Sequence, residues 1–129
     1  MKITQIKSFM IGDDDRRYHI VKVETDEGIY GLGEVGIGFW GAAIEQALGH
    51  LSEIVVGEDP FSTERLWQHM FRGSFFPADK VYCSAISAID IALWDIKGKA
   101  AGDAGLQAAW RTRTRQGGLL SPQRGRHHR

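Results

Sequence analysis

The chain has 129 residues and one cysteine, with 16 basic and 16 acidic side chains, and 43% of its residues are hydrophobic. These values are typical of one globular domain and exclude wholesale disorder, a disulfide framework and a cysteine-only zinc site. The zero formal net charge gives no reason to expect nucleic acid as a partner. No apolar run approaches the ~18 residues of a membrane span and no signal peptide is evident, so a cytoplasmic protein without a membrane partner is expected.

The zero net charge conceals two regions of opposite sign. Residues 1–102 carry 10 basic and 15 acidic side chains, whereas residues 103–129 hold six arginines and a single acid, Asp103. The second region also lacks Val, Ile, Phe, Tyr, Met and Lys, so it cannot bury enough apolar surface to offset its chain entropy. We therefore expect a globular domain over residues 1–102 and a disordered basic tail over residues 103–129.

The first third of the chain predicts three strands. Lys2–Phe9 and Tyr18–Thr25 are rich in β-branched and aromatic residues, and the acidic segment Met10–Arg17 between them is interpreted as a solvated connection. A turn with Gly28 at a position of positive φ precedes a third strand at Ile29–Leu32. We expect a three-stranded antiparallel meander, which needs a covering layer on one face to be stable.

Three helices are predicted to supply that layer. Ala42–Val55 has apolar residues at helical spacing, and Asp59 followed by proline is typical of an N-cap that opens a helix through Phe71. Val81–Ala100 is the longest periodic stretch, and its apolar stripe is wider than a helix covering one sheet face requires. The fold class is therefore α+β, a meander followed by about three helices, and the last helix is expected to have two partners.

Two acidic or glycine-rich motifs have ordinary structural explanations. Gly31–Gly36 matches G-x-G-x-x-G, but the preceding strand belongs to a hairpin and not to a parallel β-α-β unit, so flexible turn glycines are favoured over nucleotide binding. The Asp13–Asp15 run lacks the ligand spacing of a calcium loop and is followed by two arginines, so a solvated loop is favoured. Asp90 and Asp95 in the last helix are expected to accept hydrogen bonds rather than to take part in catalysis.

Phe39 and Trp40 stand out as two large aromatic residues within a glycine-rich loop, Gly36–Gly41. Aromatic loop residues often line ligand pockets. Packing over the edge of the sheet is the alternative, and the sequence leaves both interpretations open.

Three motifs in the correct order resemble one family. These are Gly28-Ile-Tyr-Gly-Leu-Gly-Glu34, Gly57-Glu-Asp-Pro60 and the long segment Ala85-Ile-Ser-Ala-Ile-Asp-Ile-Ala-Leu-Trp-Asp-Ile-Lys-Gly-Lys-Ala100. Together they resemble the N-terminal domain of the enolase superfamily, in its mandelate racemase/muconate lactonizing enzyme group, with acid-sugar dehydratases the nearest members. The resemblance covers residues 1–102.

The resemblance implies a capping function. In the family this α+β domain covers a β/α barrel, and three carboxylates of the barrel bind the Mg²⁺ that stabilises an enediolate formed by proton abstraction alpha to a carboxylate. The resemblance implies that two loops, about Met10–Arg17 and Val35–Gly41, close over the acid-sugar substrate. No catalytic residue or metal ligand carries over to this chain, which lacks the barrel. The candidate capping residues are Asp13, Asp14, Arg16, Ile37, Phe39 and Trp40.

The resemblance ends at Gly102, and codon degeneracy offers an explanation. Gly102–Arg111 can be encoded by GGG GAT GCC GGT CTA CAA GCT GCT TGG CGG, and removal of one G gives Gly-Met-Pro-Val-Tyr-Lys-Leu-Leu-Gly-Gly. This resembles the family's continuation into the barrel. We therefore expect that a single inserted nucleotide shifted the reading frame of residues 103–129.

Two functional hypotheses remain open from the sequence. The first is a truncated and inactive acid-sugar dehydratase or racemase, whose missing barrel is the second partner of the last helix. In that case the stripe through Ile89, Leu93, Trp94 and Ile96 is expected to be exposed and to promote self-association. The second is a stand-alone binding module that uses Phe39 and Trp40 as anchors.

Overall fold

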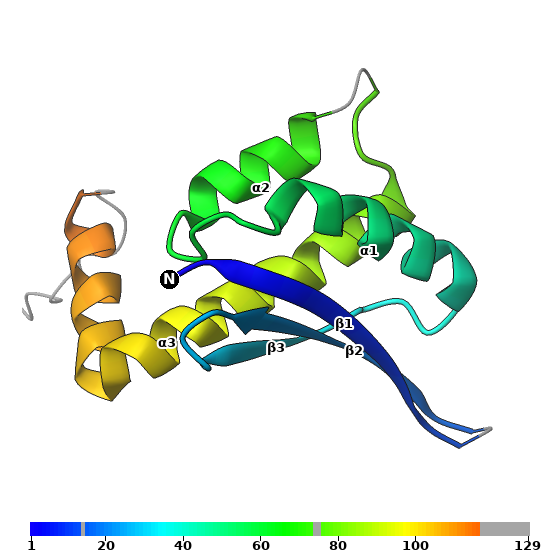
Figure 1. Ribbon diagram of the computed structural model, residues 1–129, viewed down its shortest axis with the longest axis horizontal. Coiled ribbons are helices and arrows are strands. Elements are labelled where there is room, and N and C mark those ends of the chain that lie inside the picture. Colours follow the sequence, from blue (N-terminus) through cyan, green and yellow to red (C-terminus); the bar gives the residue numbers. More distant parts are fainter. Residues whose placement is uncertain (14, 74–75, 117–129) are drawn as a thin grey trace, which may run out of the picture.

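The computed structural model describes residues 1–13, 15–73 and 76–116, and for residues 103–116 the backbone alone. Three strands are followed by three helices, which confirms the α+β fold (Figure 1). The strands form one antiparallel sheet in the order β1-β2-β3, with β2 in the centre. The elements are β1 (Ile3–Gly12), β2 (Arg17–Thr25), β3 (Tyr30–Glu34), α1 (Gly41–Val55), α2 (Thr63–Arg72) and α3 (Lys80–Gln116).

The β1–β2 hairpin is longer than the sequence predicted. Its pairing continues from Met10↔His19 to Gly12↔Arg17, so the predicted connection of residues 10–17 is wrong and only residues 13–16 lie between the strands. The apolar and aromatic side chains on both sides of the acidic run favour extended pairing, which overrides the polarity of the tip. The predicted turn after β2 is confirmed, with Gly28 at φ 78°.

The helices cover one face of the sheet. Helices α1 and α3 pack on the strands, and α2 packs on α1 and α3 (Figure 1). Alternation along β2 buries Val21 and Val23 toward this layer. The buried apolar residues are Ile3, Val21, Val23, Val35, Ile44, Ala47, Leu48, Leu51, Val55, Leu66, Met70, Ala85, Ile86, Ala88, Ile89, Ala92, Leu93 and Ile96.

The expectation that the apolar stripe of the last helix is exposed is wrong. Ile89, Leu93 and Ile96 are fully buried, and Trp94 is half-buried. Helix α3 lies against β2 and β3 on one side and against α1 and α2 on the other, so both partners of its wide apolar surface belong to this chain. A missing barrel is therefore not needed to explain the width of the stripe.

Two glycines allow α3 to approach β3 at backbone distance. A Cβ atom on Gly31 would lie 1.9 Å from the Ala92 carbonyl oxygen, and one on Gly33 would lie 1.9 Å from that of Ala88. Ala88 and Ala92 are themselves fully buried. Gly31 and Gly33 are thus strand residues required for close packing, and the interpretation of the G-x-G-x-x-G motif as flexible turn glycines is wrong at these two positions.

The outer edge of β3 is closed by polar groups of α3. Asp95 Oδ2 accepts a hydrogen bond from the Leu32 amide at 2.9 Å and contacts Lys99 Nζ at 2.8 Å. Lys99 also donates to the Tyr30 carbonyl at 2.7 Å, and its ammonium lies 4.3 Å from the centre of the Tyr30 ring. The predicted acceptor role of Asp95 is confirmed, and it leaves fewer unpaired groups at an edge where another strand could add.

Two helix starts differ from the predictions. Asp59 accepts the Phe61 amide in a turn instead of capping a helix, so α2 begins at Thr63. Asp79 supplies the cap that the sequence analysis missed at α3, where its carboxylate accepts the Tyr82 amide at 2.9 Å.

The composition boundary near Gly102 coincides with a break in α3. Gly102 has φ 66° and ψ 171°, and helical backbone resumes after it through Gln116. The disorder expected from the sequence for residues 103–129 stays a prediction. Residues 117–129 of the expected tail lie outside the described residues.

Candidate functional site

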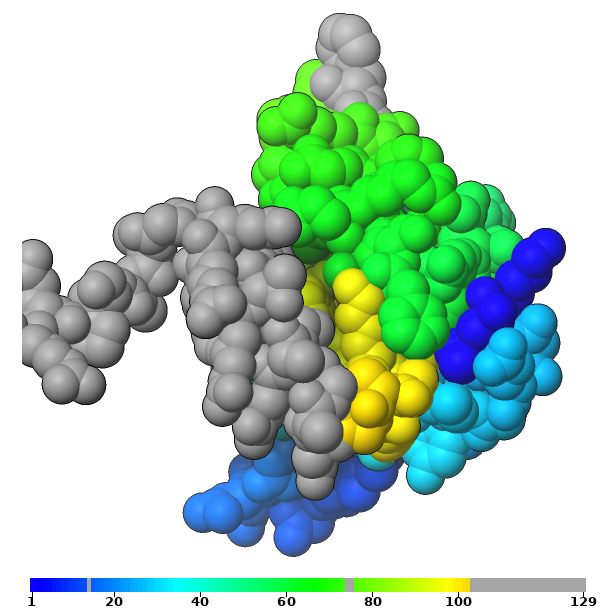
Figure 2. All heavy atoms as spheres, turned by 90° about the vertical axis from the view of Figure 1, so that its left-hand side faces the viewer, coloured from blue at the N-terminus to red at the C-terminus, as the bar shows by residue number. Residues whose placement is uncertain are grey.

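The two loops proposed from the resemblance lie at the same end of the sheet. The β1–β2 hairpin extends beyond the helical layer, toward the lower right in Figure 1, and its blue atoms project below the helices in Figure 2. The segment 35–40 connects β3 to α1 beside this hairpin. A Cβ atom on Gly41 would lie 3.4 Å from Met10 Cε, so the start of α1 lies close to β1.

The hairpin tip is a closed turn. Asp13 Oδ1 accepts hydrogen bonds from the amides of Asp15 and Arg16 at 3.1 and 3.0 Å, and the Asp13 amide donates to the Arg16 carbonyl. Gly12 makes this turn possible, because it has φ 128° and a side chain there would collide with the Arg16 carbonyl oxygen. Asp13 is thus engaged in the turn, Arg16 is exposed, and Asp14 lies outside the described residues.

The aromatic loop, residues 35–40, presents two large side chains to solvent. Phe39 is 79% exposed and Trp40 is 69% exposed, so the alternative that they pack over the sheet edge is wrong. Ile37 is half-buried and packs against the core, which anchors the middle of the loop. Trp40 caps α1 with φ 71° and ψ 29°, a left-handed conformation that is costly for a bulky residue.

A polar cluster that the sequence analysis missed joins the hairpin to α1. Glu45 Oε1 and Oε2 accept a hydrogen bond from Ser8 Oγ at 2.7 and 2.6 Å, and His19 Nε2 lies 2.9 Å from Oε1. The three residues come from β1, β2 and α1, so their spacing in the sequence gives no signal. His19 is 4% exposed, whereas Glu45 is 43% exposed.

This cluster does not have the arrangement of a nucleophilic triad. Nucleophilic catalysis by serine requires a histidine between the hydroxyl and the carboxylate. Here the carboxylate of Glu45 lies between Ser8 and His19, and the structure gives the imidazole no contact with the hydroxyl among the described residues. Its hydrogen bonds connect β1, β2 and α1, so the arrangement is structural.

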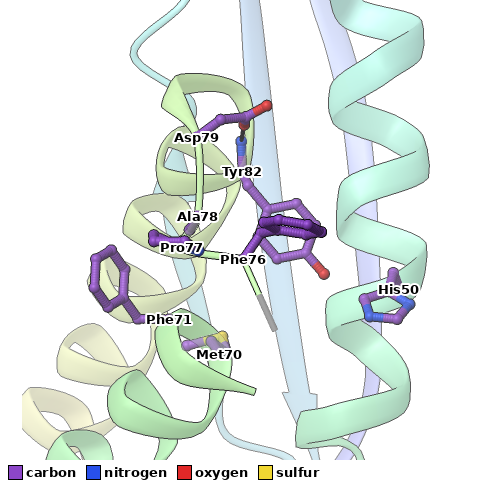
Figure 3. Close-up of a pocket in the computed structure, with 8 residues that line it drawn as sticks. All are labelled: His50, Met70, Phe71, Phe76, Pro77, Ala78, Asp79 and Tyr82. Carbon is purple, nitrogen blue, oxygen red and sulfur yellow. Dashed lines mark hydrogen bonds between the residues drawn. The ribbon is translucent and has the colours of Figure 1, made fainter. Parts of the chain in front are cut away.

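A separate hollow of about 310 Å³ lies between α1, α2 and the start of α3 (Figure 3). Its lining is mostly apolar, and the rings of His50 and Tyr82 are 6.0 Å apart between centroids. Burial raises the pKa of the Tyr82 phenol, so this group is neutral over the physiological range. With Asp79 engaged in capping α3, the described residues that line the hollow present no acid–base pair.

The side chains that the structure describes do not offer a magnesium site. Among the side chains that the structure describes, no three His, Cys, Asp or Glu residues lie close enough to hold a metal ion. The Mg²⁺ implied by the family is therefore not assigned to any residue of this chain. In the same described part of the chain, no helix has both the length and the apolar character to cross a membrane.

Sequence comparison supplies relatives over more than three-quarters of this chain. A D-galactonate dehydratase of Xanthomonas campestris pv. campestris is 45% identical over 102 residues, which are 79% of this chain and 26% of the relative. A D-galactonate dehydratase of Cronobacter sakazakii is 42% identical over 99 residues, covering 77% and 25% of the two chains. This chain thus spans about a quarter of the length of the curated relatives it matches.

Solved structures agree with the sequence relatives. A member of the enolase superfamily from Salmonella Typhimurium matches with a TM-score of 0.72 and 42% identity, over 78% of this chain and 27% of that one. An enolase from Pantoea ananatis with bound D-gluconate and Mg matches with a TM-score of 0.74 and 36% identity, over 78% and 25% of the two chains. The family described as mandelate racemase/muconate lactonizing enzyme, N-terminal domain, matches residues 5–106. The chain therefore belongs to this N-terminal domain family of the enolase superfamily.

Proposed function

We propose that this chain is the capping and specificity domain of a Mg²⁺-dependent acid-sugar dehydratase and has no catalytic activity by itself. The D-galactonate dehydratase relatives and the relative with bound D-gluconate and Mg support this substrate class. Because the chain spans about a quarter of those relatives, the groups that abstract the proton and hold the metal belong to a further domain in this proposal. No catalytic step is assigned to this chain.

The observation that carries the proposal is the exposure of Phe39 and Trp40 in a loop whose start and end are attached to the sheet. Aromatic side chains commonly line ligand pockets, and two of them side by side in one loop offer a surface that a ligand or partner can cover. Over a substrate site, the two rings exclude water and contact the apolar C–H face of a sugar acid. The exposed guanidinium of Arg16 at the hairpin tip has the chemistry to bind a substrate carboxylate.

A domain exchange tests the proposal. Residues 1–101 of this chain replace the corresponding part of the Xanthomonas campestris D-galactonate dehydratase, and dehydration of D-galactonate is measured with Mg²⁺ present. We expect turnover by the chimera and none by the 129-residue chain. In the chimera, Trp40→Ala is expected to lower kcat/KM by about tenfold or more with the melting temperature nearly unchanged.

Three outcomes contradict the proposal or a part of it. Turnover by the purified 129-residue chain shows that this chain is itself a catalyst. A folded chimera without activity favours the alternative of a stand-alone binding module, in which Phe39 and Trp40 anchor a different partner. A Trp40→Ala chimera with unchanged kcat/KM assigns that residue no capping role.

A further inference from the structure

We propose that Ser8, His19 and Glu45 form a positioning cluster, which fixes the aromatic loop (residues 35–40) against the β1–β2 hairpin and so contributes to substrate specificity. Its effect on specificity rests on the proposed capping function, whereas its effect on the loop does not. None of the three side chains is assigned a contact with substrate. They act through the position of Phe39 and Trp40.

His19 holds the segment around the aromatic loop from both sides. Its backbone carbonyl accepts the Val35 amide at 2.9 Å, where the loop begins. Its Nε2 atom meets Glu45 Oε1 at 2.9 Å, just after the loop has become α1. One residue of the central strand is therefore bonded to the segment before and after Trp40, and this restricts the conformations open to the residues between.

The first turn of α1 supports the same connection. Trp40 accepts the Ile44 amide at 3.0 Å through its carbonyl, and Glu45 is the next residue along the helix. Met10, which pairs with His19 across the hairpin, lies beside Gly41, where an added Cβ atom would be 3.4 Å from Met10 Cε. A shift of Glu45 therefore moves the turn that holds the left-handed conformation of Trp40.

Burial makes His19 dependent on Glu45. The imidazole is 4% exposed, and its Nδ1 atom has no hydrogen-bond partner among the described residues. Glu45 is thus the side chain that compensates the removal of this ring from water. Without the carboxylate, a buried imidazole keeps no polar side-chain partner, and the hairpin and α1 must rearrange to restore one.

The test uses the 129-residue chain and does not require activity. Glu45→Ala, Glu45→Gln and Ser8→Ala are compared by hydrogen exchange of the Val35 and Ile44 amides and by the NMR resonance of the Trp40 indole N–H. The indole resonance is assigned with a Trp40→Phe variant. Glu53→Ala is the matched control, because Glu53 is an exposed carboxylate on α1 with no bonded partner in the described part of the chain.

Glu45→Ala is expected to raise exchange at Val35 by about tenfold or more relative to the core amide of Leu51 and to shift the Trp40 resonance. Glu45→Gln is expected to restore most of the protection, since its amide oxygen accepts from Ser8 and His19. Exchange at Val35 that matches the Glu53→Ala control overturns the proposal. If Glu45→Ala also raises exchange of the Leu51 amide, the Ser8→Ala variant decides instead. Ser8→Ala removes one hydrogen-bond donor only and must raise exchange at Val35 to a smaller degree.

The chimera with the Xanthomonas campestris enzyme adds the specificity arm. Glu45→Ala is expected to change the ratio of kcat/KM for D-galactonate and D-gluconate at least about threefold, and Glu53→Ala is not. A loosened loop in an inactive chimera supports the positioning cluster and contradicts the dehydratase assignment. An unchanged loop in an active chimera supports the dehydratase assignment and contradicts the positioning cluster. The two proposals can therefore fail separately.

Discussion

Strand β3 and the aromatic loop that follows it are held in place by different means. Along the strand, Gly31 and Gly33 let the α3 backbone approach to a distance at which a methyl group has no room. Beyond its end, the aromatic loop is attached by Ile37, by the His19 carbonyl and by the polar contacts of Glu45. Close packing allows one arrangement only, whereas a few polar contacts at a partly exposed position can be altered without loss of the core. The comparison separates the part that determines the fold from the part that presents Phe39 and Trp40.

The largest effect is expected from adding a methyl group to β3 where α3 packs against it. Gly33→Ala places a Cβ atom 1.9 Å from the Ala88 carbonyl oxygen and should lower the free energy of unfolding by about 3 kcal/mol. Gly36→Ala in the loop is the control, because nothing lies within 4 Å of its added Cβ. Urea denaturation followed by circular dichroism measures both. Equal stability of the two variants contradicts the close approach of α3.

A smaller effect is expected where α3 closes the edge of β3. Asp95→Asn should cost about 1.5 kcal/mol, the lower limit for a charged hydrogen bond, because the carboxylate is 36% exposed and solvent screens it. The measurement is the difference in unfolding free energy between wild type and variant at about pH 7 and about pH 2.5.

The pH dependence of that difference has a definite sign. Burial opposes ionisation of Asp95, but the Lys99 ammonium and the Leu32 amide outweigh it and hold the pKa below its usual 3.8. The carboxylate therefore stabilises the fold above that value, and the stabilisation is lost as the pH falls through the lower pKa of the folded state. A wild-type advantage that persists in acid contradicts an ionised Asp95 at this edge.

The sequence predicted the packed strands and helices better than the exposed hairpin. Periodicity identified β2, α1 and α3, because each buries a continuous apolar face against a neighbour. It placed the end of the first strand too early, since the acidic run resembles a loop although Met10 and Ile11 pair with β2. The partner of the wide α3 stripe was assigned to another domain, because a stripe shows how much is buried and not by what.

The candidate site was only partly accessible to sequence reasoning. Phe39 and Trp40 were found because large aromatic residues among glycines are unusual in a loop. The cluster of Ser8, His19 and Glu45 was not found, because its members are separated by 11 and 26 residues and meet only when the hairpin folds against α1. The role of Gly31 and Gly33 was likewise hidden, since the motif does not reveal the helix that packs on it.

An effect of about 1 kcal/mol is expected from the conformation of Trp40. Trp40→Gly should be more stable than Trp40→Ala by this amount, because glycine adopts φ 71° without the penalty that a Cβ imposes. Thermal unfolding of the two variants gives the difference. If alanine is equally stable, the left-handed conformation is not maintained in solution.

The smallest effect on stability is expected on the hairpin. Ile11 is 56% exposed near the tip, so Ile11→Lys should change the unfolding free energy by less than about 0.5 kcal/mol. It should nevertheless reduce hydrophobic-dye binding and any self-association, because the expected helix stripe is buried and the hairpin provides exposed apolar surface instead. Sedimentation velocity of both proteins checks this. Unchanged dye binding and self-association in Ile11→Lys show that another surface is responsible.

The matched spacing of Gly31 with Ala92 and of Gly33 with Ala88 limits how this domain can change in length. Two residues of a strand cover about 6.7 Å and four residues of a helix about 6 Å, so the two glycines and the two alanines coincide in one alignment only. An insertion or deletion of a single residue between Gly31 and Gly33 or between Ala88 and Ala92 puts the two contacts out of alignment. The aromatic loop between Glu34 and Gly41 carries no such constraint, so lineages of this domain can lengthen or shorten it while the scaffold keeps its residue count.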